Sequence, residues 1–249
     1  MKTIRDFALI AVLTCSHIPL NAQGTVQFQN LDFEAASVQM SQSQSVVSSA
    51  SALPGWTVYF GSSLQTQVGC DLVALGSTWV TLVGTNSDTV FNRLQGDFGV
   101  LLQGGSTAPY AAISQTGLVP ANAQSLLFNA QPGLTTLQVS LGGVSLPFFA
   151  ISAGPNYATY ACDVSAFAGK SDELTFSALS NIAGNNNWNI DSIQFSPTPV
   201  PEPAGLGIIT LGGFLMLWQP FLPGKKRGQK TLVRRRVELK FCGGNWDAN

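Results

Sequence analysis

The stretch Leu137-Gln138-Val139-Ser140-Leu141 shows most plainly how this chain folds, because apolar and polar residues alternate strictly along it. In an extended strand Leu137, Val139 and Leu141 share one face, and Gln138 and Ser140 lie on the other. This pattern is typical of a strand with one face against a core and the other in solvent. The stretch therefore predicts a half-buried β-strand.

Similar short segments recur along the chain at intervals of about ten residues, separated by Gly, Pro, Asn or Asp. No window predicts an amphipathic helix, although 165–168 can form one helical turn. The predicted fold class is therefore all-β, an antiparallel β-sandwich. The clearest further segments are Trp79–Val83, Phe98–Gln103, Tyr110–Gln115, Leu174–Ser177 and Asp191–Phe195; in the last, Asp191, Ile193 and Phe195 are expected to share a face.

The N-terminal residues have the order of a secretory signal peptide. Residues 1–5 carry positive charge, residues 7–13 are apolar, and small residues precede a cleavage position after Ala22. We therefore expect a leader over 1–22 and a sandwich domain over 23–199. Within that domain the Ser/Gln-rich stretch 37–51 is predicted to be a loop with little order.

The charge of the chain is strongly asymmetric. Segment 24–199 contains two basic residues, Arg93 and Lys170, and nine acids, which gives 2 − 9 = −7. Eight of the twelve Lys and Arg residues follow Gly224. A body without a basic surface cannot neutralise phosphates, so we expect no nucleic-acid partner.

Residue types also limit the chemistry. The one histidine, His17, lies in the predicted leader, so the mature body has none for a Ser-His-Asp or Cys-His site or for a histidine-ligated zinc site. The neighbouring acids Asp172 and Glu173 are expected to point apart rather than flank a glycosidic bond. We expect a protein that is not an enzyme.

The body has two cysteines, Cys70 and Cys162. In an exported protein they can form a disulfide that closes a long loop and stabilises by roughly 3–5 kcal/mol. Alternatively they are buried thiols in a β-core, and the sequence leaves both alternatives open.

A three-part segment follows the body. It begins with Val200-Pro201-Glu202-Pro203, continues as the apolar run 204–222 and ends with the basic cluster 225–227. As a helix, the apolar run would be about 28 Å long, just enough to span a bilayer. Positive charge at the leader and after the span places the body outside the cytoplasm.

This order resembles the PEP-CTERM sorting signal of Gram-negative bacteria, with the signal over 200–236. The resemblance implies recognition by an exosortase, a membrane enzyme that cuts near Pro-Glu-Pro, and export through the inner membrane to the cell envelope, cell surface or extracellular matrix. An ordinary membrane anchor is the alternative. Family members usually stop soon after the basic cluster, whereas residues 237–249 form an atypical tail here.

The body also resembles galactose-binding-like jelly rolls, which include carbohydrate-binding modules. The matching elements are Asn30, Phe33-Glu34, Gly55-Trp56 and Asp191. The resemblance implies that Glu34 and Asp191 lie in neighbouring first and last strands and, with Asp32, help to hold a structural Ca²⁺. Surface carboxylates that cap turns are the alternative.

Five aromatic residues are candidates for a sugar-stacking platform or for core positions: Trp56, Tyr59, Trp79, Tyr110 and Trp188. Trp56 is expected to be buried, and Trp79, Tyr110 and Trp188 are the candidate glycan contacts. The predicted function is an exported, structural or exopolysaccharide-associated protein of the cell envelope. The alternative is a carbohydrate-binding module for environmental polysaccharide.

Overall fold

The computed structural model describes residues 26–39, 45–74, 76–84, 91, 93–133, 136–181 and 186–200. All of these belong to one compact unit, Met1–Pro201. A second unit, Glu202–Asn249, lies outside the described residues.

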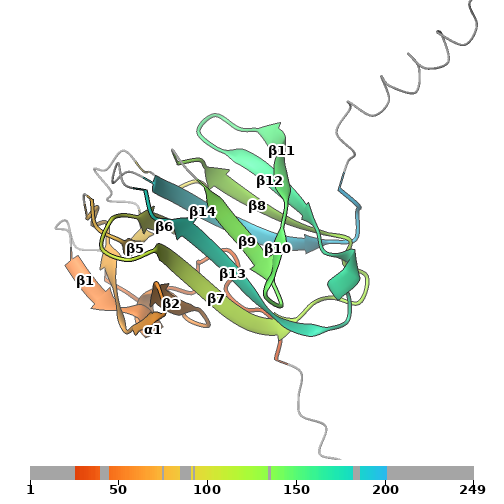
Figure 1. The fold of residues 1–249 in the computed structure, drawn as a ribbon, viewed down its shortest axis with the longest axis horizontal. Helices are drawn as coiled ribbons and strands as arrows, with labels where there is room; N and C mark the ends of the chain where they lie inside the picture. The colour runs from red at the N-terminus through yellow and green to blue at the C-terminus, as the bar shows by residue number, and fades with distance from the viewer. Residues whose placement is uncertain are drawn as a thin grey trace, which may run out of the picture. The chain divides into compact units, whose positions relative to one another are not determined.

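The described residues form two packed β-sheets (Figure 1). The prediction of an all-β two-sheet sandwich is confirmed. The eight-stranded sheet has the order β1 (Ser45–Ser48), β4 (Gln67–Cys70), β5 (Trp79–Val83), β6 (Gly99–Gly104), β14 (Asn186–Ser196), β8 (Ser125–Gln131), β12 (Ala158–Asp163) and β11 (Phe148–Ala153). The six-stranded sheet has the order β10 (Val144–Leu146), β9 (Leu137–Leu141), β13 (Ser171–Leu179), β7 (Tyr110–Leu118), β2 (Thr57–Phe60) and β3 (Ser63–Gln65).

Strand pairing is antiparallel throughout the described ladders except between β4 and β5. The predicted strand Leu137–Leu141 is β9, and its three apolar side chains are buried in the core as expected. The helical turn predicted at 165–168 is the short 3₁₀ helix η1 (Ser165–Phe167). The alternation therefore located the strand correctly, and the predicted helical turn is also confirmed.

The face prediction for the last strand was wrong. Ile190 and Ile193 both belong to the core, which places Asp191 on the opposite face from Ile193. The register against β8 shifts between Asp191 and Gln194, and Ser192 has a φ of 49°. This bulge adds a residue to β14 and reverses the alternation after it.

The core lies between the two sheets and is rich in aromatic residues. Phe128 from the eight-stranded sheet packs against Phe176 from the six-stranded sheet, with ring centroids 5.2 Å apart. Phe33 packs against Trp56 at 5.6 Å, and Trp56 is 6% exposed, as predicted for a buried residue. These contacts join the opening segment, β8 and β13 in one core.

The prediction of a loop over 37–51 was wrong for its second half. Residues 45–48 form β1, which pairs with β4, and α1 (Ser49–Ala52) follows at once. Val47 packs against the core, and Ala52 is fully buried. Two valines with a pairing partner are sufficient for an edge strand, although the stretch is rich in Ser and Gln.

The alternative of a Cys70–Cys162 disulfide is wrong for this fold. Both are buried thiols that are not bonded to each other. Cys70 lies in β4 and Cys162 in β12, five strand positions away in the same sheet, or about 24 Å at the usual spacing. A disulfide requires Cα atoms about 4.4–6.8 Å apart. Burial, with the charge of Asp163, raises the pKa of Cys162 to about 12.

The predicted leader, the apolar run 204–222 and the tail 237–249 lie outside the described residues. Of the predicted sorting motif, Val200 is described, whereas Pro201, Glu202 and Pro203 are not. Among the described residues no helix has the length and apolar character needed to cross a membrane.

Candidate functional site

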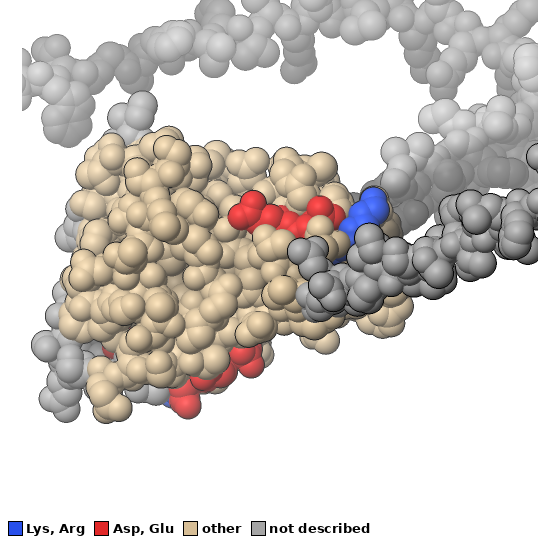
Figure 2. All heavy atoms as spheres, turned by 90° about the horizontal axis from the view of Figure 1, so that it is seen from below, with Lys and Arg blue, Asp and Glu red and all other residues tan. Residues whose placement is uncertain are grey.

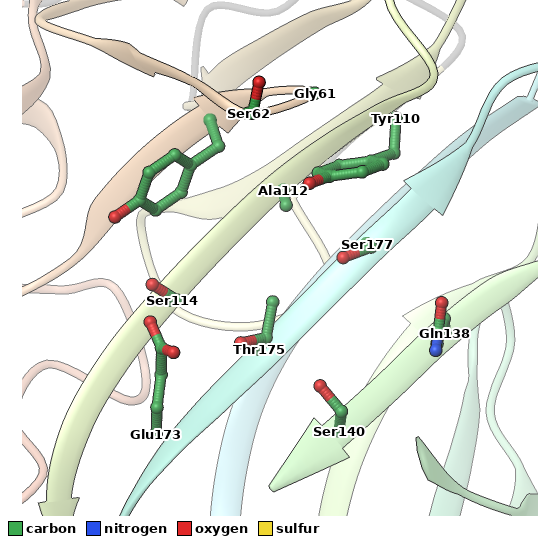
Figure 3. Close-up of a pocket in the computed structure, with 11 residues that line it drawn as sticks. Gly61, Ser62, Tyr110, Ala112, Ser114, Gln138, Ser140, Glu173, Thr175 and Ser177 are labelled. Atoms are coloured by element: carbon green, nitrogen blue, oxygen red, sulfur yellow. The ribbon is translucent and has the colours of Figure 1, made fainter. Parts of the chain in front are cut away.

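The outer face of the six-stranded sheet carries an open groove of about 390 Å³ (Figure 3). It crosses four neighbouring strands, β2, β7, β13 and β9, a width of about 14 Å at the usual strand spacing. Its lining consists of two tyrosines and mostly small or polar residues: Tyr59, Gly61, Ser62, Tyr110, Ala112, Ser114, Gln138, Ser140, Glu173, Thr175 and Ser177.

Strand register arranges the floor of the groove in two parallel rows. One row runs Tyr59, Ala112, Ser177 and Gln138 across the four strands. The next row, two residues along each strand, runs Thr57, Ser114, Thr175 and Ser140. Residues opposite each other on paired strands have Cβ atoms about 5 Å apart, so the side chains of each row form a continuous line across the sheet.

The polar positions of the alternating strands form this floor. In β9, Gln138 and Ser140 face the groove, while Leu137, Val139 and Leu141 face the core. In β13, Glu173, Thr175 and Ser177 alternate in the same way with Leu174 and Phe176. The pattern that directs one face into the core thus places hydroxyl, amide and carboxylate groups on the other.

Larger side chains border the floor. Tyr59 and Tyr110 are half-buried and line the groove, so part of each side chain is accessible from it. Figure 3 shows Tyr110 and Glu173 at opposite ends of the groove, with Ser177 and Thr175 between them along β13. The groove therefore combines aromatic surface at one end with a carboxylate at the other.

The polar groups of the groove are available to a ligand. Within the described part of the chain, no side-chain hydrogen bond to protein involves the hydroxyls of Ser140, Thr175 or Ser177, the Gln138 amide or the Glu173 carboxylate. Among the described residues lining the groove, Glu173 is the one charged side chain. The groove offers many neutral donors and acceptors and one negative charge.

The other sheet has no comparable open face over β5 and β6, because a segment crosses it there. Thr81 Oγ1 donates to the Leu72 carbonyl at 2.6 Å, and the Ala74 N–H donates to Gln103 Oε1 at 3.2 Å. Leu101 and Gln103 are buried although they lie on the outer side of β6. The outer face of the eight-stranded sheet is therefore covered over β5 and β6.

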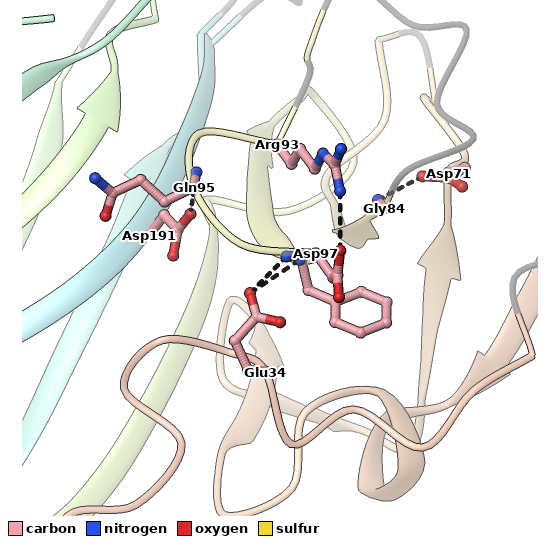
Figure 4. Close-up of polar contacts among 8 residues, drawn as sticks. Glu34, Asp71, Gly84, Arg93, Gln95, Asp97 and Asp191 are labelled. Carbon is pink, nitrogen blue, oxygen red and sulfur yellow. Dashed lines mark hydrogen bonds and ion pairs between the residues drawn. The ribbon is translucent and has the colours of Figure 1, made fainter.

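The predicted acidic cluster anchors a loop (Figure 4). Glu34 Oε1 accepts the N–H groups of Asp97 and Phe98 at 2.8 and 3.1 Å, and Asp191 Oδ2 accepts that of Gln95 at 2.8 Å. Gly96, at a φ of +55°, lies against Glu34, and a Cβ there would clash with Oε1. The loop 95–98 is held from two sides.

The prediction of a calcium site at Asp32, Glu34 and Asp191 is not supported. Glu34 lies in the turn at 31–35 rather than in a strand, although the Ile193 N–H donates to the Leu31 carbonyl beside it. Asp32 Oδ1 faces the Glu34 N–H at 3.4 Å. No group of three potential metal ligands occurs among the described residues, and Glu34 and Asp191 instead accept backbone N–H groups of the loop 95–98.

Burial raises the pKa of Asp191 to about 6, and the negative charge of Glu34 adds to this, although N–H groups of Gln95 and Ser192 oppose it. A pKa above the ordinary 3.8 means that the native state binds more protons than the unfolded chain between about pH 4 and 6. The contribution of the Asp191 carboxyl to the free energy of unfolding is therefore present at pH 4 and is lost as the pH rises through 6.

We expect Asp191→Asn to remove this pH dependence. The free energy of unfolding of the wild type, minus that of the variant, should fall by about 2 kcal/mol from pH 4 to pH 7, at 1.36 kcal/mol per pKa unit, because the unfolded carboxyl is already partly ionised at pH 4. Urea unfolding of both proteins at each pH measures it. Asp97→Asn, an exposed acid of the same loop, is the control and should give a nearly constant difference. A constant difference for Asp191→Asn as well would contradict the assignment.

The three candidate glycan contacts lie in different places. Tyr110 lines the groove. Trp79 packs on Phe60 at 5.2 Å and lines a separate depression of about 410 Å³. Trp188 is 7% exposed and packs edge-on against Phe148 and Tyr160, so its prediction as a glycan contact was wrong.

Most of the groove was not predicted from the sequence. Gln138 and Ser140 were predicted to face solvent, and Thr175 and Ser177 lie in a predicted strand, but none of the four was given a role. The signal in the sequence is that two strands alternate core residues with short hydroxyl or amide side chains rather than with Lys or Glu. Register then places the two strands side by side.

No family model and no curated protein matches the chain. Among solved structures, it is similar to the enzymatically active domain of bacteriophage CBA120 tailspike protein 4 (16% identity, 65% of this chain, 21% of that chain, TM-score 0.35). It is also similar to the family 11 carbohydrate-binding module from Clostridium thermocellum in complex with a β-1,3-1,4-mixed-linked tetrasaccharide (10% identity, 64% of this chain, 98% of that chain, TM-score 0.34).

A third similar structure is the family 11 module of the C. thermocellum cellulosomal cellulase Lic26A-Cel5E (11% identity, 65% of this chain, 98% of that chain, TM-score 0.33). The chain spans about a fifth of the tailspike domain and nearly all of each module.

Proposed function

We propose that this domain binds a neutral polysaccharide in the groove on the six-stranded sheet. The observation that carries the proposal is the combination of two half-buried tyrosines with rows of unengaged hydroxyl and amide groups on one open sheet face.

The chemistry of the groove suits a sugar chain. A pyranose ring has an apolar face of C–H groups and a periphery of hydroxyls. The rigid rings of Tyr59 and Tyr110 can stack on the apolar face at a low entropic cost. Donors and acceptors for the sugar hydroxyls come from Ser140, Thr175, Ser177 and Gln138. A groove that crosses four strands suits an extended chain better than a single sugar.

The charge of the groove favours an uncharged chain. Glu173 can accept hydrogen bonds from sugar hydroxyls, but its negative charge opposes uronate, sulfate or phosphate groups, and no Lys or Arg is among the described lining residues. In the view of Figure 2 much of the surface carries neither acid nor base. An anionic glycan therefore has no counter-charge in the groove.

We further propose that the domain binds without hydrolysing. Glycoside hydrolysis ordinarily needs two carboxyl groups about 5–10 Å apart across the bond. The described groove lining supplies one, Glu173, and the neighbouring acid Asp172 packs against Gly142 rather than lining the groove. A binding role needs no second acid.

Affinity electrophoresis in gels that contain a polysaccharide tests the proposal. The panel has neutral members, such as xylan, glucomannan and mixed-linked β-glucan, and anionic members, such as polygalacturonate and alginate. We expect retardation by at least one neutral member and by none of the anionic ones. Free migration through every neutral gel, with the protein folded, would contradict the proposal.

Glu173→Gln is the matched variant for charge. It keeps a side chain of the same size that accepts hydrogen bonds but removes the negative charge. We expect it to weaken exclusion of the anionic members while it retains binding to the neutral one. Unchanged exclusion would show that Glu173 does not set the charge preference.

We also propose that the protein is exported and sorted to the cell envelope or extracellular matrix by an exosortase, where polysaccharide binding would associate it with exopolysaccharide. The leader 1–22, the acidic body and the order of motif, apolar run and basic cluster over 200–236 support this. Expression with and without an exosortase, followed by blotting for a C-terminal tag, tests it. Loss of the tag only with exosortase is expected, and an uncut protein in both strains would contradict it.

A further inference from the structure

A second depression shares Gln138 with the groove and lies where β9, β10 and β13 meet the start of β11, the edge strand of the other sheet. It has a volume of about 390 Å³, and Gln138 lines both hollows. The depression is lined by Thr136, Leu137, Gln138, Ser145, Leu146, Pro147, Phe148 and Leu179.

Strand register shows that the two hollows lie next to each other. Leu179 of the depression lies opposite Tyr110 of the groove, and Ser145 lies opposite Ser140. The row that begins at Tyr59 ends at Gln138, the shared residue. A chain lying along this row from β2 toward β9 would reach the depression directly.

The chemistry changes at Gln138. The groove is lined mainly by hydroxyl groups, whereas five of the eight residues of the depression are apolar, among them Leu179, Pro147 and the half-buried Phe148. A sugar hydroxyl placed against these side chains would lose water without gaining a partner, which is unfavourable. A methyl group placed there would gain apolar burial.

We propose that this depression binds an O-acetyl group of the polysaccharide whose sugar rings occupy the groove. The inference rests on the proposed function, because proximity to the groove determines which molecule reaches the depression. Leu179 and Pro147 contact the acetyl methyl group, and Gln138 and Thr136 at the margin can donate to its carbonyl oxygen. The site thus distinguishes acetylated from unmodified chains of the same backbone.

The test compares acetylated and alkali-deacetylated forms of two neutral polysaccharides, xylan and glucomannan, in affinity electrophoresis with the full-length protein. We expect at least about threefold tighter binding to the acetylated form of the backbone that binds, the amount that burial of one methyl group provides. Equal binding to both forms would overturn the inference and leave the proposed function standing. Binding to neither form of either backbone, with the protein folded, would contradict both.

Two variants locate the effect. Leu179→Asn should remove the preference for the acetylated form while binding to the deacetylated form stays within about twofold. Ser145→Asp, at an exposed position, adds a carboxylate to the margin with little risk to folding and should have the same effect. Tyr59→Ala should weaken binding of both forms equally. A preference that persists in both Leu179→Asn and Ser145→Asp would overturn the assignment to this depression.

Discussion

Replacement of Tyr59 and Tyr110 by alanine should abolish polysaccharide binding. Both tyrosines are half-buried and line the groove, and they are the aromatic residues among its described lining residues. Aromatic residues of this kind carry a large share of the binding energy of many recognition sites, and their truncation commonly costs 2 kcal/mol or more. We expect each single variant to weaken binding by at least about tenfold, since 1.4 kcal/mol corresponds to one factor of ten. The double variant should show no retardation in affinity electrophoresis.

The matched control for the tyrosines is Trp79→Ala. Trp79 is also half-buried and aromatic, but it lines the separate depression with Phe60 and Leu72. Its removal should leave binding within about twofold of wild type in protein shown to be folded by circular dichroism. Loss of binding in Trp79→Ala with normal binding in Tyr59→Ala would place the site elsewhere.

Replacement of Phe128 by alanine should have the largest effect on stability. Phe128 is fully buried and contacts the rings of Phe148, Tyr160 and Phe176 with centroids 5.2–5.5 Å apart, so it joins the two sheets and the β11–β12 hairpin. Truncation of a buried phenylalanine costs about 3–5 kcal/mol because packing is lost and a cavity remains. This is a large fraction of the usual 5–15 kcal/mol stability of a domain.

Urea unfolding followed by tryptophan fluorescence measures this loss. Phe128→Leu, which retains apolar volume, should lose less than half as much, and Leu64→Ala, at a residue 62% exposed, should change little. A loss below about 1 kcal/mol for Phe128→Ala would contradict the central place of this ring in the core.

The strands could be predicted from the sequence because alternation of apolar and polar residues is a local property. Leu137–Leu141 and Leu174–Ser177 show in their own residues which face is buried, and the structure agrees. The β14 bulge defeated the same reasoning, because Ser192 adopts a positive φ that no neighbouring residue type indicates. Local patterns therefore predicted strands but not where a strand changes face.

The site depended on information that is not local. Tyr110 and Trp188 were both predicted glycan contacts, but one lines the groove and the other is buried against β11 and β12. Pairing of β7 with β2 and β13, which joins residues more than fifty positions apart, decides which side chains share a surface. The polar faces of β9 and β13 were visible in the sequence, whereas their convergence with Tyr59 required the sheet order.

Heteronuclear NMR of the protein, titrated with an oligosaccharide of the neutral polysaccharide that binds most tightly, is the most direct test that the groove binds polysaccharide. We expect the largest shifts in amides of Tyr59, Ser114, Gln138, Ser140 and Thr175, on four strands of one sheet, while amides of β5 and β6 stay unchanged. Shifts confined to the other sheet, or centred on Trp79, would contradict binding in the groove.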